Sequence, residues 1–138
     1  MMNKMEVFFS SRTENIIFIR AAVVSFLLNL DLEVAILNEI KTVVSEAVTN
    51  SIVHGYESDP LNVINVKCSY DKEEIMLEVI DQGIGINDVK QAKRPMFTTK
   101  KNEERSGLGF TIMEAFSDEL LVESTVGEGT TIKCIKKI

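Results

Sequence analysis

The sequence predicts an α+β fold: a two-layer α/β sandwich whose mainly antiparallel, mixed sheet is covered by helices on one face. Three observations lead to this prediction. Apolar and polar residues alternate, as in strands, at the start, in the middle and at the end of the chain; two helical patterns follow the first strand; and short polar turns join neighbouring strands. With 138 residues, 45% of them hydrophobic, the chain has the size and composition of one domain covering residues 1–138.

The first part of the chain predicts one strand and two helices. Residues 4–9 alternate well enough for a short strand. Residues 11–14 (Ser-Arg-Thr-Glu) form a potential capping box at the head of an apolar-rich helix that runs to Leu30. A second helix is predicted over residues 33–54, where apolar residues recur at three- and four-residue steps, and Gly55 ends it.

The remainder predicts antiparallel strands on either side of a long loop. A helix opens at the glycines of residues 107–109 and runs to Phe116. Residues 87–105 are polar, rich in Lys and Arg and without a steady period, so they predict a loop with one short helix. Loops of this length are usually functional lids or disordered segments. The strands are predicted over residues 62–70, 75–80, 119–123 and 131–135.

Charge and composition exclude several classes of function. The formal net charge is −6 and no long basic run occurs, so we expect no direct binding to nucleic acid, which depends on many Lys and Arg contacts to phosphates. The longest apolar stretch, residues 21–30, is too short to span a bilayer and no secretory leader opens the chain, so we expect no membrane association and a cytoplasmic location. Cys68 and Cys134 lie in predicted strands and are expected to be buried thiols.

A stripe of polar residues follows one side of the second predicted helix. Glu46, Asn50 and His54 are four residues apart, and Glu39 lies two turns before Glu46. On an isolated helix such a stripe is most often a solvated face. It becomes a candidate site because of the two glycine-rich segments that follow it in the chain.

Those glycine-rich segments flank the long loop. Residues 81–85 (Asp-Gln-Gly-Ile-Gly) place a carboxylate at a strand end, with glycines that let the backbone approach a flat ligand. Residues 105–109 (Arg-Ser-Gly-Leu-Gly) place a cation and glycines before a helix, where backbone amides favour phosphate oxygens. Each segment alone is equally consistent with an ordinary glycine turn.

The loop between the glycine-rich segments concentrates positive charge within an acidic protein. A solvated segment would explain the charge, whereas a lid that closes over a polyphosphate explains both the charge and the missing periodicity, and we favour the lid. Its basic residues are Lys90, Lys93, Arg94, Lys100, Lys101 and Arg105.

Taken together, the motifs resemble those of a known ATP-binding family. Residues 46–55 (Glu-Ala-Val-Thr-Asn-Ser-Ile-Val-His-Gly) are similar to the N box, residues 81–85 to the first glycine box and residues 105–109 to the second glycine box of the GHKL family, shared by gyrase, Hsp90, histidine kinases and MutL. Within that family, the short length and the N-box sequence most resemble the anti-sigma factor serine kinases, and the similarity covers essentially the whole chain.

The resemblance implies a role for each matched residue. Asn50 would coordinate Mg²⁺ that bridges the phosphates of ATP, Asp81 would accept the exocyclic amine of adenine, and Glu46 would act as the catalytic base. Thr130 would support Asp81. The backbone around the nucleotide would be formed by Gly83, Gly85, Gly107, Leu108 and Gly109, and the groups that close on the phosphates would be Lys100, Arg105 and Ser106. No role is assigned to His54, for which packing near the helix end and phosphate contact both stay open.

The resemblance also implies a function. An anti-sigma factor of this kind is a homodimer that binds a sigma factor and phosphorylates a serine of an anti-anti-sigma protein. Two alternatives are a histidine-kinase-like ATPase domain and a nucleotide-gated sigma-binding module with little kinase activity. The only histidine, His54, lies within the N box itself, which counts against the first alternative.

A surface for partner proteins is predicted on the first helix. Arg20 is expected to be exposed there among the apolar residues Ile16, Ile17 and Phe18, where it would meet the sigma factor or the anti-anti-sigma protein. The alternative is that these apolar residues belong to the core or to a dimer interface and that Arg20 is solvated.

Overall fold

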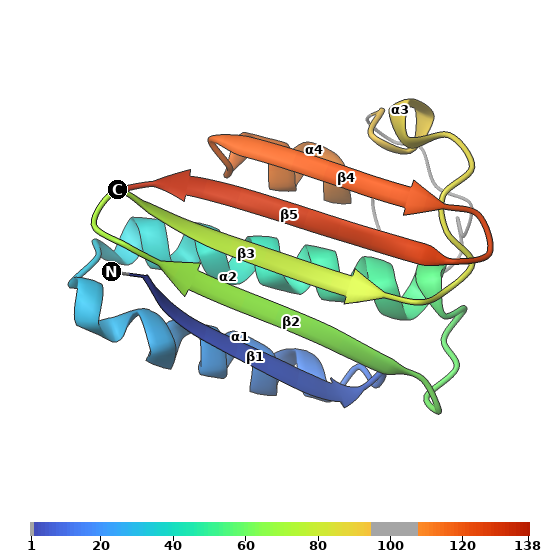
Figure 1. Ribbon diagram of the computed structural model, residues 1–138, viewed down its shortest axis with the longest axis horizontal. Coiled ribbons are helices and arrows are strands. Elements are labelled where there is room, and N and C mark those ends of the chain that lie inside the picture. The colour runs from blue at the N-terminus through green and yellow to red at the C-terminus, as the bar shows by residue number, and fades with distance from the viewer. Residues whose placement is uncertain (1, 95–107) are drawn as a thin grey trace.

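The computed structural model describes residues 2–94 and 108–138, which form a five-stranded sheet with helices packed against it (Figure 1). The strand order is β1-β2-β3-β5-β4, and all four pairings between neighbouring strands are antiparallel. The sheet is therefore more uniform than the mixed sheet expected. The elements are β1 (Asn3–Ser10), α1 (Asn15–Leu27), the 3-10 turn η1 (Leu28–Leu30), α2 (Val34–Asn50), the π turn η2 (Ser51–Gly55), β2 (Val63–Tyr70), β3 (Glu74–Asp81), α3 (Val89–Ala92), α4 (Gly109–Ala115), β4 (Glu119–Thr125) and β5 (Gly129–Lys137).

The helices α1, α2 and α4 lie on one face of the sheet, with α2 between the other two (Figure 1). The apolar side of α2 is buried against the strands through Val43, Val44, Ala47 and Val48. Alternate residues of the central strands, such as Val66 in β2 and Val79 in β3, face this layer and are buried. The periods of the sequence, two in the strands and about 3.6 in the helices, thus place one core between two layers, which confirms the predicted fold class.

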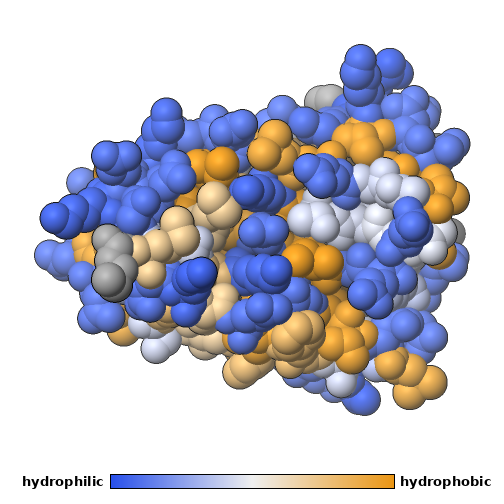
Figure 2. Space-filling view, viewed as in Figure 1, coloured by the Kyte–Doolittle hydropathy of each residue, from blue (hydrophilic) through white to orange (hydrophobic). Residues whose placement is uncertain are grey.

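No helix of the described residues covers the opposite face of the sheet, where charged side chains are mixed with exposed apolar ones (Figures 1 and 2). Glu6, Lys67, Glu78 and Lys133 are direct neighbours in the strand register, so charges of alternating sign cross this face. Opposite charges on neighbouring strands favour this register. The candidate site lies on the helix-covered side of the sheet, at the end where β3 finishes with Asp81.

One local prediction is wrong. The expected capping box at residues 11–14 does not begin α1, because the helix starts at Asn15 and its N-cap residue, Glu14, makes no side-chain cap hydrogen bond. The backbone N–H of Ser11 instead donates to the carbonyl of Asn62 at 2.8 Å, and its buried hydroxyl has no hydrogen-bond partner among the described residues. The contact with the segment before β2 keeps Ser11 beside the sheet, so the helix begins later.

Two further expectations concern the cysteines and membrane association. Cys68 and Cys134 are free and buried, as predicted, and burial raises the pKa of the Cys68 thiol to about 12. Both thiols are thus covered side chains of the core. None of the helices in the described part of the chain combines the length and apolar character needed to cross a bilayer.

Candidate functional site

The carboxylate of Asp81 forms the centre of the candidate site. Asp81 is the last residue of β3, and its side chain is buried, with 3% of the residue exposed. Its Oδ1 accepts a hydrogen bond from the backbone N–H of Gly83 at 3.0 Å, and its Oδ2 accepts one from the Ser51 hydroxyl at 2.9 Å. Thr130 lies opposite Asp81 in the register of β3 and β5, and its backbone provides a further hydrogen bond to the carboxylate.

Burial raises the pKa of the Asp81 carboxyl above its ordinary value, while the hydrogen bonds from Gly83, Ser51 and Thr130 act in the opposite direction. A carboxylate has about four acceptor positions, so the donors found among the described residues leave one position open. A buried carboxylate with an open acceptor position suits a ligand that brings an N–H donor into an enclosed site. The exocyclic amine of adenine is a donor of this kind.

The glycines after Asp81 are required by contacts within the chain. A Cβ at Gly83 would collide with the carbonyl oxygen of Gly55, and Gly85, with φ of +78°, has its Cβ direction blocked by the backbone of Thr125. The Ile84 N–H donates to the Gly55 carbonyl at 2.9 Å, which fixes the same approach. The sequence had suggested that these glycines let the backbone approach a ligand. The close approaches described here are between two segments of the protein and hold the turn beside Asp81.

Two buried or half-buried hydroxyls that the sequence analysis missed hold the same turn. The Tyr56 hydroxyl donates to the carbonyl of Val63 at 2.7 Å and accepts from the Gln82 N–H at 2.7 Å, so it links the end of the N-box segment to the residue after Asp81. Tyr56 directly follows the N-box resemblance, and a buried tyrosine usually finds a partner for its hydroxyl. In the sequence, only this tendency of buried tyrosines pointed to a role for Tyr56.

Ser124, on β4, holds the far side of the turn. Its hydroxyl accepts from the Ile86 N–H at 2.6 Å, donates to the Gly129 carbonyl at 3.1 Å and shares a hydrogen bond with the Thr130 hydroxyl at 2.7 Å. The Thr130 side chain therefore bonds to Ser124, while its backbone bonds to Asp81. The turn at residues 82–86 is thus fixed from both sides by the rest of the fold.

The second helix brings the N-box residues to this turn. Glu46 and Asn50 lie one turn apart near the end of α2, both half-buried. The chain then continues into the π turn η2, which places the Ser51 hydroxyl against the Asp81 carboxylate. Only a glycine fits at position 55 of this turn, because a Cβ there would lie 2.8 Å from the Asp81 carboxyl carbon. Wide turns of this type often occur at functional sites.

The second glycine segment meets the same helix. Gly109 is the first residue of α4, and a Cβ added to it would lie 3.1 Å from Oε2 of Glu46. Leu108 stands just before it, at the N-cap position, without a side-chain cap. The structure therefore brings Glu46 and the start of α4 together.

Several predicted site residues cannot be placed. Lys100, Arg105, Ser106 and Gly107 lie outside the described residues, with much of the predicted basic lid. Within the described part of the lid, Lys93 forms an ion pair with Glu114 of α4 at 3.4 Å. His54 is half-buried in the last turn of η2, and both interpretations of its role stay open.

The predicted partner surface on α1 differs from expectation in one respect. Ile17 and Phe18 are 73% and 49% exposed, but Arg20 is half-buried, and its Nε is buried without a hydrogen-bond partner among the described residues. Arg20 directly follows the fully buried Ile19, so it lies at the edge of the buried side of the helix. The helix therefore presents Ile17 and Phe18 more openly than Arg20.

No group of three or more His, Cys, Asp or Glu side chains in residues 2–94 and 108–138 is arranged to hold a metal ion. Asn50 is nevertheless compatible with magnesium, because its half-buried side-chain amide offers a hard oxygen ligand one turn from Glu46. Such a site would take its other ligands from water and from the phosphates of a bound nucleotide.

Comparison with known proteins agrees with the family resemblance of the three motifs. The family model for the histidine kinase-like ATPase domain matches residues 9–136. The anti-sigma F factor of Geobacillus kaustophilus is 49% identical over 138 residues, which are 100% of this chain and 94% of that protein. The anti-sigma F factor of Geobacillus stearothermophilus is 50% identical over 132 residues, which are 96% of this chain and 90% of that protein.

A solved structure has the same fold. The RsbU and RsbW domains of Rv1364c from Mycobacterium tuberculosis superpose with a TM-score of 0.65 over 97% of this chain and 31% of that chain, at 18% sequence identity. At this level of identity the likeness concerns the arrangement of strands and helices alone.

Proposed function

Because the chain belongs to the histidine kinase-like ATPase domain family and, within it, groups with the anti-sigma F factors, we propose that it is an anti-sigma factor with protein serine/threonine kinase activity. In this proposal it binds sigma factor F and uses Mg-ATP to phosphorylate a serine of an anti-anti-sigma factor. In the same proposal it acts in the cytoplasm and forms a homodimer. A molar-mass measurement in solution would test for the dimer.

One observation carries the proposal most directly. A single helical stretch, α2 with η2, contacts both halves of the candidate site: Ser51 bonds to the buried Asp81 carboxylate, and Glu46 lies beside the first residue of α4. A nucleotide whose base amine is held at Asp81 would therefore have its phosphates within reach of Asn50 and Glu46 on α2. This arrangement supports ATP as the ligand.

The residues of this face divide the chemistry between them. The oxygen of the substrate serine forms a bond to the γ-phosphorus as the bond from that phosphorus to the bridging oxygen of ADP breaks, and Glu46 takes the hydroxyl proton. Asn50 would hold Mg²⁺, which supplies positive charge against the phosphate oxygens. Lys100, Arg105 and Ser106 keep their predicted role at the phosphates.

The test is transfer of label from γ-labelled Mg-ATP to a candidate anti-anti-sigma protein, measured beside capture of sigma factor F. We expect acid-stable label on a serine of the partner and stoichiometric capture of the sigma factor. Capture and ADP binding without any transfer would instead favour the nucleotide-gated binding module. Acid-labile label on a histidine would favour the histidine-kinase-like alternative.

The proposed contact with partner proteins lies on α1, around Arg20. The exposed Ile17 and Phe18 beside it support this location. We expect Arg20→Glu to weaken capture of the sigma factor by about tenfold or more, since a reversed charge at an interface opposes binding. The measurement is a binding titration, with Arg12→Glu as the control because Arg12 is an exposed arginine that precedes the helix. Equal affinities for wild type and Arg20→Glu would remove Arg20 from the interface.

A further inference from the structure

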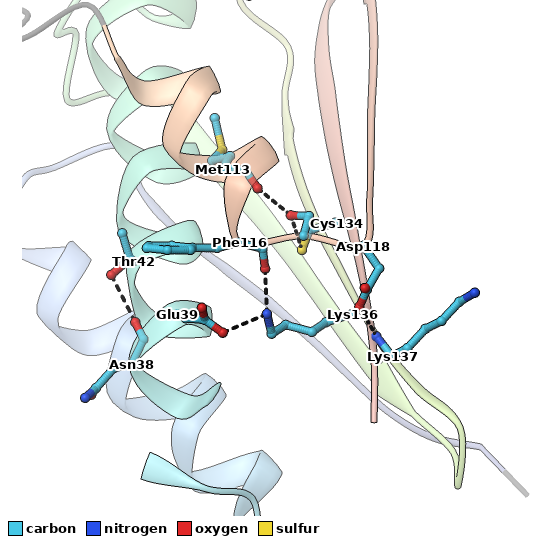
Figure 3. Close-up of polar contacts among 10 residues, drawn as sticks. Asn38, Glu39, Thr42, Met113, Phe116, Asp118, Cys134, Lys136 and Lys137 are labelled. Carbon is cyan, nitrogen blue, oxygen red and sulfur yellow. Dashed lines mark hydrogen bonds and ion pairs between the residues drawn. The ribbon is translucent and has the colours of Figure 1, made fainter. Parts of the chain in front are cut away.

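Lys136, on β5, contacts both α2 and the end of α4. The contact with α2 lies in the first half of α2, away from the end of that helix that meets Asp81. Lys136 lies on the helix-facing side of β5, and its side chain is 13% exposed. Its Nζ donates to the carbonyl oxygen of Phe116 at 2.8 Å and forms an ion pair with Oε1 of Glu39 at 2.9 Å (Figure 3). A largely buried ammonium needs such partners, and here they belong to two different helices.

The first partner closes the end of α4. Phe116 is the C-cap residue of that helix, so its carbonyl is among those that have no partner within the helix. A positive charge at this end is also favoured by the helix dipole. Lys136 therefore caps α4 from a neighbouring strand.

The second partner connects this cap to the site. Glu39 and Glu46 are both on α2, about two turns apart, and Gly109 and Phe116 are separated by the same number of residues along α4, so each pair spans about 10 Å. At one end Gly109 lies beside the Glu46 carboxylate, and at the other end Lys136 links Phe116 to Glu39. Thus α4 lies alongside α2, close to Glu46 at its first residue and linked to Glu39 through Lys136 at its last turn.

Other contacts hold the same end of α4 to β5 without reaching α2. The Ser117 hydroxyl donates to the Met113 carbonyl at 2.6 Å and contacts the Cys134 sulfur at 2.9 Å (Figure 3). The ion pair between Lys93 and Glu114, at 3.4 Å, is more exposed and contributes little, because water and salt screen it. The Lys136 ion pair with Glu39 provides a charged link from this end of α4 to α2 within residues 2–94 and 108–138.

We propose that Lys136 is a positioning residue of the phosphoryl-transfer site: by anchoring the C-terminal end of α4 to Glu39, it sets where Gly109 lies against the Glu46 carboxylate. The proposal rests on the function proposed above. A helix as short as α4 does not hold its place by itself, so its position depends on contacts such as this one. Displacements of about 1 Å at a reacting group are enough to slow transfer strongly.

The experiment compares Lys136→Met with Lys136→Arg and with Lys137→Met, using wild-type protein as reference. Lys137 is a matched control, since it is the next residue of β5, is exposed, and points away from Lys136 in Figure 3. For each variant we would measure the melting temperature, the affinity for ADP and the rate of label transfer from saturating Mg-ATP to the anti-anti-sigma protein.

We expect Lys136→Met to lower the transfer rate by about tenfold or more, and by much more than it lowers the ADP affinity. Lys136→Arg, which keeps a charge and donors, should recover most of the rate, and Lys137→Met should behave as wild type. A wild-type rate for Lys136→Met would overturn the proposal. So would a parallel loss of melting temperature, ADP affinity and rate in both Lys136 variants, because Lys136 would then serve the fold alone. If the wild type itself bound ADP but transferred no phosphate, the proposed kinase function would fail, and this inference with it.

Discussion

Replacing Glu46 with Gln is expected to slow phosphoryl transfer by about 10²–10⁴-fold, the usual contribution of a general base, while ADP still binds. The amide has nearly the shape of the carboxylate, so it should fit beside Gly109 as Glu46 does. It cannot take the proton of the attacking hydroxyl. The measurement is single-turnover transfer from γ-labelled Mg-ATP, with ADP affinity determined on the same preparation.

Glu33→Gln provides the matched control, because Glu33 is exposed at the start of the same helix and the change removes the same charge. It should transfer phosphate at the wild-type rate. If Glu46→Gln kept more than about a tenth of the wild-type rate, Glu46 could not be the base. A loss of ADP affinity together with the rate would instead show that Glu46 holds the nucleotide or the helix α4 in place.

The layers of the fold could be predicted because they follow from periodicity along the chain. The helix pattern of α2 and the alternation in β2 and β3 place buried residues at regular steps, and a short polar turn can join those strands only as a hairpin. The start of α1 could not be predicted from its local motif. Its position depends on the bond from Ser11 to Asn62, a contact between segments far apart in the sequence.

The site shows the same division between local pattern and long-range contact. Asp81 and Glu46 could be proposed as candidates because each sits in a motif of neighbouring residues. Ser51 and Ser124 were missed because a serine gains a role only through the group that it meets. Ser51 meets Asp81, and Ser124 meets the N–H of Ile86, each pair being 30 or more positions apart in the chain.

The glycines show how a correct motif can carry a second physical reason. A ligand-facing role was predicted for Gly83 and Gly85. Their missing side chains are already required by the backbones of Gly55 and Thr125, whatever the ligand. A glycine box of this type therefore first builds the turn that holds the buried carboxylate, and substitution at Gly83 would damage the fold before it affected binding.

Asp81→Asn is expected to reduce the affinity for ADP by about ten- to 150-fold, because hydrogen bonds to a charged group contribute about 1.5–3 kcal/mol. The variant should still fold. Its neutral amide resembles the uncharged form of the carboxyl, and burial favours that form, as the raised pKa of Asp81 indicates. Isothermal titration of ADP and thermal melting without nucleotide are the two measurements.

Asp31→Asn is the matched control for this change. Asp31 is exposed and has a φ of 51°, a conformation that asparagine also adopts readily. The control should bind ADP as the wild type does. Unchanged affinity in Asp81→Asn would mean that adenine is not read by Asp81. A melting temperature below that of the wild type would indicate that the carboxylate mainly holds the Gly83 turn.

The pH dependence of the wild type gives an independent check, because the protonated Asp81 carboxyl favours folding, whereas the ionised carboxylate favours ADP binding. Its pKa is raised in the folded protein, so the folded state binds the proton more readily than the unfolded state, and the contribution to stability is greatest below the ordinary pKa of 3.8. That contribution is lost as the pH rises through the raised pKa. Adenine needs the ionised form, because protonation turns an accepting oxygen into a donor. ADP affinity should therefore fall as the pH is lowered through the raised pKa, while Asp81→Asn shows a flatter profile over the same range.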